Sequence, residues 1–139
     1  MRHRLIMAGL DSSVRVDSCG TQDYHVGEPP DARSQRHAKA RGYDLSGLRA
    51  RQLVSEDFDR FDLLLVADES HLFHLRSMAK PAQRDKVKLL MTYAPQSGLR
   101  EVPDPYYGAA DGFEHVLDLI ESAVDGVLAS IQSRDARPD

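Results

Sequence analysis

Cysteine, tryptophan and long apolar runs are scarce or missing in this sequence of 139 residues, which has one Cys and no Trp. The single cysteine, Cys19, excludes an internal disulfide, fits a reducing compartment and limits thiol chemistry to one candidate. The longest clean apolar run, residues 63–67, is far too short to span a bilayer. Residues 5–10 are only mildly apolar and do not make a signal peptide. The sequence therefore predicts a cytoplasmic protein with no membrane partner.

The sequence has no excess of positively charged residues. The formal net charge is −4 at pH 7. Neither a basic stripe nor a run of aromatic residues interleaved with Lys and Arg is present, so we expect no nucleic-acid partner. Apolar residues make up 41% and charged residues 29%, proportions that are ordinary for a soluble globular protein. We expect one domain over residues 1–133 and a polar tail over residues 134–139.

The spacing of apolar residues predicts strands that alternate with helices. Residues 63–67 form a continuous apolar run between two aspartates, which is typical of a strand buried on both faces. Further strands are expected at residues 14–18 and 87–91, and helices at residues 1–9, 32–41, 68–78 and 113–131. The three prolines of residues 93–112 indicate a loop. This alternation predicts an α/β fold with a mostly parallel sheet.

Several stretches of the chain together resemble one protein family. They are residues 16–21, 24–31, 42–46 with 49–52, 57–62, 101–108 and 112–114. In order and spacing they resemble the bacterial low-molecular-weight protein-tyrosine phosphatases over nearly the whole chain. The resemblance implies a flavodoxin-like, doubly wound parallel sheet with flanking helices. It also implies hydrolysis of phosphate monoesters through a cysteinyl-phosphate intermediate, without a metal or another cofactor.

The most specific of these matches is the Asp-Pro-Tyr-Tyr-Gly motif of residues 104–108. The resemblance implies that Asp104 is the general acid that protonates the leaving phenolate. It also implies that Tyr106 and Tyr107, with Tyr24 on the opposite wall, flank the ring of the substrate. The expected substrate is a phosphotyrosine protein or a small aryl phosphate. Without the resemblance, the motif would indicate only a turn with two half-buried tyrosines.

The nucleophile of that reaction has no counterpart in the chain. The family places Cys-x5-Arg-Ser between its first strand and first helix, and the sequence here begins with a segment that resembles the middle of that helix. We therefore expect the central first strand and the phosphate loop to lie upstream of Met1, and the chain as given to be inactive. Cys19 is separated by five residues from His25, not from an Arg, so we expect a small buried cysteine. Ser18 matches a residue that supports the phosphate loop, whereas Leu48 stands where the family often has a bracing His.

Three functions stay open at this point. The first is a tyrosine phosphatase whose complete form includes the missing loop. The second is a non-catalytic, phosphatase-like module that binds a partner through the surface of Tyr24 and Tyr106. The third is an arsenate reductase of the same fold, which normally needs resolving cysteines in addition to Cys19.

Two further groups of side chains have the composition of a site. His71 and His74 have the spacing of a shared helix face, but only Asp68 is near them in sequence, so solvent exposure is expected and not metal binding. A cluster of acidic residues is expected to form a solvated face, and its members are Glu56, Asp57, Asp59 and Asp62.

Overall fold

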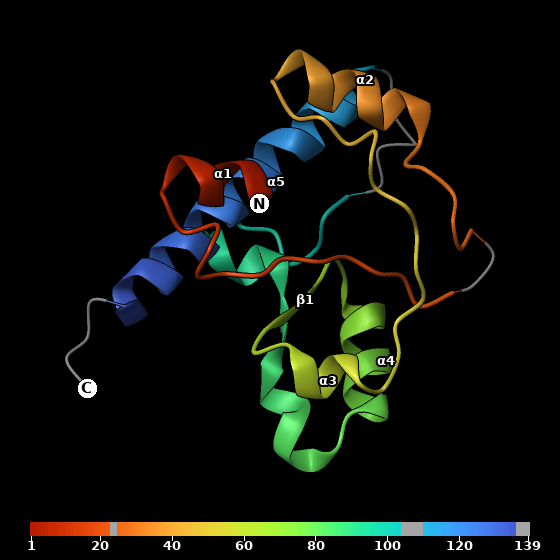
Figure 1. The fold of residues 1–139 in the computed structure, drawn as a ribbon, viewed down its shortest axis with the longest axis vertical. Coiled ribbons are helices and arrows are strands. Elements are labelled where there is room, and N and C mark those ends of the chain that lie inside the picture. The colour runs from red at the N-terminus through yellow and green to blue at the C-terminus, as the bar shows by residue number, and fades with distance from the viewer. Residues whose placement is uncertain (23–24, 104–109, 136–139) are drawn as a thin grey trace.

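The computed structural model describes residues 1–22, 25–103 and 110–135 (Figure 1). Within these residues, α-helices and short 3-10 helices accompany two strands. The α-helices are α1 (Arg2–Met7), α2 (Ala32–Ala40), α3 (Asp57–Arg60), α4 (Glu69–Met78) and α5 (Ala110–Asp135). The 3-10 helices are η1 (Pro81–Lys86), η2 (Leu90–Tyr93) and η3 (Pro95–Ser97), and the strands are β1 (Leu64–Val66) and β2 (Val87–Leu89). Figure 1 shows α3, α4 and the sheet in its lower half and α1, α2 and α5 in its upper half.

Strands β1 and β2 pair in parallel, with Leu64 opposite Val87 and Val66 opposite Leu89. Helix α4 lies between them in the chain, as a parallel pair requires. The predicted α/β fold with a parallel sheet is confirmed. The expected burial of residues 63–67 on both faces is wrong, because Leu64 and Val66 are buried whereas Leu65 is 37% exposed. The elements in the described part of the chain pack on the face that carries Leu64 and Val66.

Buried apolar side chains gather in two clusters. The first surrounds the sheet and consists of Leu53, Phe58, Leu64, Val66, Leu75, Ala79, Val87 and Leu89. The second lies between the 3-10 helices and α5 and consists of Met91, Ala94, Leu119 and Ala123. Full burial of a large apolar side chain contributes about 1.5–3 kcal/mol relative to exposure. Each cluster therefore stabilises the part of the molecule in which it lies.

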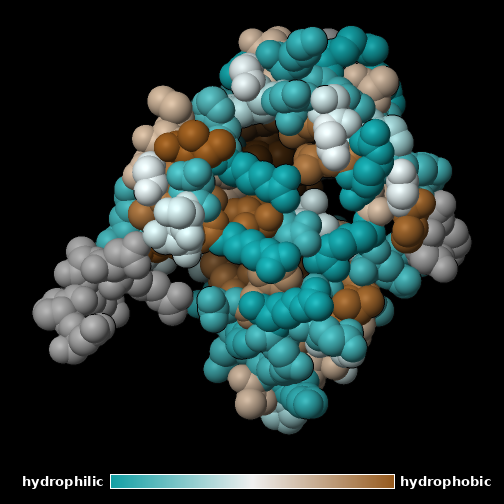
Figure 2. Space-filling view, viewed as in Figure 1, coloured by the Kyte–Doolittle hydropathy of each residue, from teal (hydrophilic) through white to brown (hydrophobic). Residues whose placement is uncertain are grey.

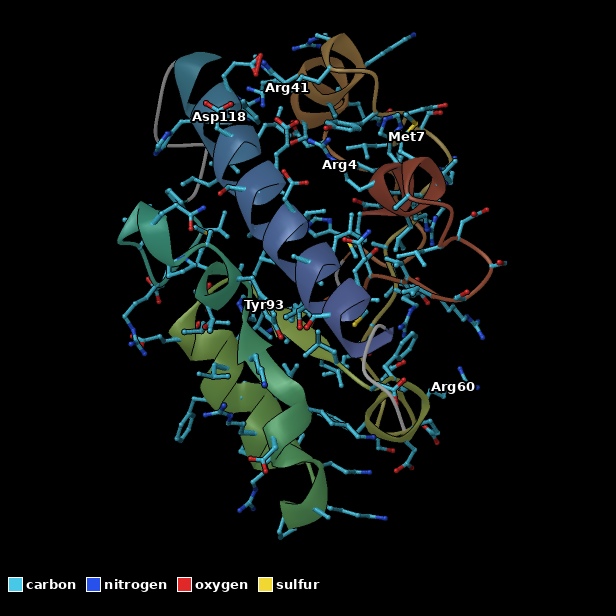
Figure 3. The ribbon with its side chains drawn as sticks, turned by 90° about the vertical axis from the view of Figure 1, so that its left-hand side faces the viewer. Arg4, Met7, Arg41, Arg60, Tyr93 and Asp118 are labelled. Carbon is cyan, nitrogen blue, oxygen red and sulfur yellow. The ribbon has the colours of Figure 1, made fainter. Side chains whose placement is uncertain are left out.

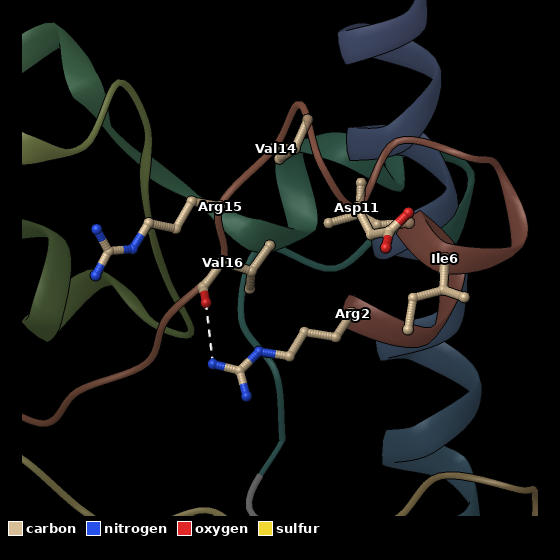
Figure 4. A pocket seen from close by; sticks show the side chains of 7 residues that line it. Arg2, Ile6, Asp11, Val14, Arg15 and Val16 are labelled. Atoms are coloured by element: carbon tan, nitrogen blue, oxygen red, sulfur yellow. Dashed lines mark hydrogen bonds between the residues drawn. The ribbon is translucent and has the colours of Figure 1, made fainter.

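Residues 14–18 form no strand, so that prediction is wrong. A strand needs a neighbour that completes its hydrogen bonds. In the described part of the chain the only pairing near this segment is a single parallel bridge between Gly20 and Gln52. The Val16 carbonyl instead accepts a hydrogen bond of 3.0 Å from the Arg2 guanidinium (Figure 4).

The same region leaves apolar surface uncovered. A shallow pocket of about 270 Å³ borders residues 14–16 and is also lined by Leu5 and Ile6 (Figure 4). Figure 2 shows brown, apolar side chains inside a hollow on this face of the molecule. The accessible surface is 9362 Å², roughly 2,000 Å² more than the scaling for a compact protein of this mass gives.

The predicted helices at residues 32–41 and 68–78 are confirmed as α2 and α4, each within a residue of the expected ends. Asp31 caps α2, because its carboxylate accepts hydrogen bonds from the backbone N–H groups of Arg33 (2.9 Å) and Ser34 (3.2 Å). Asp68 caps α4 in the same way and accepts from the N–H of His71 at 2.9 Å. Side-chain caps of this kind are readable from sequence, since Asp is a strong N-cap residue.

The predicted loop of residues 93–112 is shorter in the structure. Pro95 begins a 3-10 turn, because a proline is tolerated in the first turn of a helix, where its missing N–H is not needed. Helix α5 already begins at Ala110, includes the predicted apolar stripe of residues 113–131 and ends at Asp135. Residues 136–139 lie outside the described part of the chain, so the polar tail stays a prediction.

A cluster of charged side chains fastens α2 to α5. Arg41 follows the last residue of α2, and its guanidinium lies 2.9 Å from the carboxylates of both Glu114 and Asp118. It also contacts Glu121, to which the Tyr43 hydroxyl donates a hydrogen bond of 2.6 Å. Figure 3 shows Arg41 and Asp118 side by side at the upper end of α5. One arginine thus holds three successive acidic positions on one face of the helix.

Helix α5 comes closest to η2 at Gly126. A Cβ atom at this position would lie 1.9 Å from the carbonyl oxygen of Tyr93, which Figure 3 shows beside the helix. Real Cβ atoms never approach an oxygen so closely, so glycine permits this helix contact.

We predict that Gly126→Ala lowers the free energy of unfolding by about 2–4 kcal/mol, because the added methyl meets rigid backbone. Helix propensity alone would raise it by about 1 kcal/mol. Gly47→Ala is the control, since no atom lies within 4 Å of a Cβ built at Gly47. Urea denaturation monitored by circular dichroism measures both. A neutral or stabilising Gly126→Ala would contradict the close contact.

Candidate functional site

Residues 100–103 lead directly into the Asp-Pro-Tyr-Tyr-Gly motif and lie against the end of β1. The N–H of Val102 donates a hydrogen bond of 2.9 Å to the carbonyl of Ala67, the first residue after the strand. The Val102 side chain is half-buried and packs against the second apolar cluster, where it meets η2 and α5. The backbone of Val102 is therefore tied to one half of the molecule and its side chain to the other.

Two further contacts join this segment to the first turn of α4. The carboxylate of Glu101 accepts a hydrogen bond of 2.9 Å from the backbone N–H of Glu69. The Arg100 guanidinium binds the Glu69 carboxylate through contacts of 2.6 Å and 2.9 Å. Both partners of that ion pair are more than half exposed, so it contributes little compared with the backbone contacts. The stem of the motif is thus placed at the C-terminal end of a parallel strand.

Four of the predicted site residues lie outside the described part of the chain: Asp104, Tyr24, Tyr106 and Tyr107. Their roles stay predictions. Ser18 is described and exposed, and its backbone N–H lies 2.8 Å from the Asp17 carboxylate. Leu48 is half-buried, and its N–H donates a hydrogen bond of 3.1 Å to the Leu45 carbonyl.

Cys19 is exposed, so the expectation of a buried cysteine is wrong. The physical reason is that residues 14–18 pair with no strand in the described part of the chain, so the residue that follows them is only partly covered. Desolvation raises the pKa of the Cys19 thiol, and the carboxylates of Asp57 and Asp17 add to this against the opposing effect of Arg51. A nucleophilic cysteine needs a lowered pKa. Cys19 therefore does not have the electrostatic setting of a phosphatase nucleophile.

The ion pair between Arg51 and Asp57 was not predicted from the sequence. Asp57 is only 1% exposed, so its assignment to a solvated acidic face is wrong. The Arg51 guanidinium donates two hydrogen bonds of 3.0 Å to its carboxylate, and the N–H of Val54 donates a third of 2.9 Å. Burial opposes ionisation of Asp57, but these donors outweigh burial and lower its pKa. Arg51 also reaches Asp17 at 3.2 Å and so holds the chain near Cys19.

The two histidines of α4 differ in exposure: His71 is half-buried and His74 is exposed. His71 Nδ1 lies 2.9 Å from the carboxylate of Asp68, which also caps the helix, and the His71 side chain is nearly half exposed. Across residues 1–22, 25–103 and 110–135, no three His, Cys, Asp or Glu side chains come together as a metal site. None of the helices in those residues has the length and apolar character needed to cross a membrane.

Comparison with known proteins identifies the family of the chain. A family model described as low molecular weight phosphotyrosine protein phosphatase matches residues 1–137. A low molecular weight protein-tyrosine-phosphatase of Streptomyces coelicolor is 42% identical over 137 residues, which cover 96% of this chain and 82% of that protein. The chain therefore belongs to the low-molecular-weight protein-tyrosine phosphatase family.

Solved structures show the same relationship. The crystal structure of YfkJ from Bacillus subtilis matches with a TM-score of 0.88 and 35% identity, over 96% of this chain and 82% of that one. A protein tyrosine phosphatase from Entamoeba histolytica matches with a TM-score of 0.90 and 28% identity, over 96% and 85%. The α/β fold is thus that of the family, whose named members are protein-tyrosine phosphatases, hydrolases of phosphoric monoesters.

We predict that Asp57→Asn lowers the free energy of unfolding by about 2–4 kcal/mol near neutral pH, because it leaves the Arg51 guanidinium without its buried anion. Asp62→Asn is the matched control: Asp62 is exposed, and its change should stay within about 0.5 kcal/mol. Equal costs for the two variants would contradict the role of the pair.

The pH dependence follows from the lowered pKa of Asp57. Its stabilising contribution is fully present above the pKa of an unfolded aspartate, about 3.9, and disappears as the pH falls through the lower pKa of the folded state. The stability gap between wild type and Asp57→Asn should therefore be constant above about pH 5 and narrow below about pH 4. Denaturation curves over this range measure the gap.

Proposed function

We propose that the protein acts on phosphotyrosine in proteins or on small aryl phosphates, with Asp104 as the general acid. Tyr24, Tyr106 and Tyr107 flank the aromatic ring of the substrate in this proposal. A flat apolar slot between aromatic side chains favours an aryl phosphate over an alkyl phosphate. The single cysteine, which cannot form an internal disulfide, fits a reducing compartment and supports a cytoplasmic location.

The observation that carries the proposal is the docking of residues 100–103 at the C-terminal end of β1. In open parallel sheets, ligands bind outside the carboxyl ends of the strands. Asp104 directly follows this docked segment, whose last residue, Pro103, has a fixed φ that limits the freedom of the chain. The docking of residues 100–103 at this edge of the sheet supports the assignment of Asp104 as the acid.

The reaction needs two proton transfers, and one carboxyl group can carry out both. A thiolate attacks phosphorus, so that an S–P bond forms while the bond from phosphorus to the phenolic oxygen breaks. Asp104 gives its proton to that oxygen, which leaves as a neutral phenol. Water then attacks phosphorus, the S–P bond breaks, and the Asp104 carboxylate takes the proton from the water.

The thiolate of this reaction is not among the 139 residues. The chain contains no Cys-x5-Arg, and its one thiol, Cys19, has a raised pKa that favours the neutral form. The proposal therefore assigns the nucleophile and the phosphate-binding loop to a segment outside these residues. It assigns the acid and the aromatic walls to this chain.

We predict that the protein isolated from its own cells hydrolyses a phosphotyrosine peptide, and that Asp104→Asn at the chromosomal gene lowers kcat by about 10²–10⁴-fold. Cys19→Ser, made in the same way, should leave kcat unchanged. A recombinant chain of only the 139 residues should release no phosphate above the buffer rate. An inactive native protein, or full activity of the Asp104→Asn protein, would contradict the proposal.

The raised pKa of the Cys19 thiol favours a second candidate function. If no other thiol takes part, the protein binds phosphotyrosine ligands without turnover. A native protein that is inactive but binds a phosphotyrosine peptide, and loses that binding on Tyr106→Ala, would support this second function. Release of phosphate from a phosphotyrosine peptide by the native protein would exclude it.

A further inference from the structure

Glu101 is bound to a helix that lies 32 residues away in the chain. The first N–H groups of any α-helix have no partner within the helix and need one from outside. In α4 they are divided between two carboxylates: Asp68 accepts from the N–H of His71, and Glu101 accepts from the N–H of Glu69. The local cap is therefore complemented by a remote one.

This remote cap lies beside a second backbone contact. The residue after Glu101, Val102, donates its N–H to the carbonyl of Ala67 at 2.9 Å. Ala67 and Glu69 both belong to the junction between β1 and α4, so two consecutive residues of the stem are bound to one short stretch of chain. Two contacts on adjacent residues restrict rotation of the stem as well as its position, which one contact cannot do.

The charge of Glu101 strengthens its contact. The N-terminal end of a helix of ten residues carries a partial positive charge, and a carboxylate there is stabilised by it. A charge-assisted hydrogen bond is shorter and stronger than one between neutral groups. Glu101 is exposed, and its carboxylate ties the stem to the first turn of α4.

We propose that Glu101 is a positioning residue for the acid loop: by binding the Glu69 N–H next to the Val102–Ala67 contact, it holds the stem from which Asp104 extends. The assignment rests on the proposed function, because the position of Asp104 matters only if it is the acid. Glu101 itself touches no reacting atom. It acts through the backbone of residues 102 and 103.

Amide hydrogen exchange of the native protein tests this assignment. In Glu101→Ala, the amides of Glu69 and Val102 should exchange about five- to tenfold faster, as expected for the loss of a helix cap and its neighbouring contact. The ¹⁵N order parameter of the Asp104 amide should fall in the same variant. In Glu101→Gln, whose side-chain oxygen can accept the same hydrogen bond, all three readouts should return most of the way to wild type.

Glu69→Ala is the matched control. It removes a carboxylate and the ion pair with Arg100 at the same place, but it keeps the backbone N–H that Glu101 binds. Exchange at Val102 and the order of the Asp104 amide should change less than about twofold in this control, because an exposed ion pair contributes little. The amide of Leu89 in β2 reports global opening and should be unchanged in every variant.

Faster exchange at Glu69 alone would overturn the proposal, since Glu101 would then be a helix cap and nothing more. No change at Glu69 or Val102 would overturn it as well. If Leu89 also exchanges faster in Glu101→Ala, that variant is globally destabilised and the other two variants decide. Near-wild-type exchange at Val102 in both Glu101→Gln and Glu69→Ala supports the proposal, and faster exchange at Val102 in Glu101→Gln contradicts it. These measurements involve no hydrolysis, so a failure of the positioning role is distinguishable from a failure of Asp104 as the acid.

Discussion

The hydrogen bond from the Val102 N–H to the Ala67 carbonyl joins the two halves of the molecule at the point where its chemistry is expected. On one side lies the β1–α4–β2 unit with its own apolar cluster. On the other side the Val102 side chain packs on the cluster of η2 and α5. The acid loop begins two residues later. Any displacement of α5 against the sheet therefore acts on the segment that directly precedes Asp104 in the chain.

The parts of this fold that local physics determines were predictable from the sequence. The caps at Asp31 and Asp68 and the apolar stripe of α5 each carry a strong local signal. The errors arose where a distant partner decides the outcome. Residues 14–18 have the pattern of a strand, yet no neighbouring strand completes their hydrogen bonds in the described residues. Asp57 looks like one more surface acid, and only its contact with Arg51, six residues earlier in an irregular segment, makes it buried.

The candidate site also has a part that local sequence predicts and a part that depends on distant contacts. The motif around Asp104 was recognisable because it is short and contiguous in sequence. Its supporting contacts were not, because Glu101 and Glu69 are far apart in the chain and their bond uses a backbone N–H that no side-chain pattern reveals. The electrostatics of Cys19 were also hidden, since its raised pKa depends on desolvation and on Asp57 and Asp17. The chain thus contains the motif to which we assign the acid of a phosphatase site, whereas Cys19 is unsuited to be its nucleophile.

The central claim is that Asp104 protonates the leaving oxygen, and the leaving-group dependence of hydrolysis tests it most directly. The native protein and its Asp104→Asn variant are compared on aryl phosphates whose phenols range from acidic to as weakly acidic as tyrosine, with a pKa of about 10. The account predicts a rate nearly independent of phenol pKa for the wild type and a rate that falls steeply with rising pKa for the variant. The same slope for both proteins would contradict it.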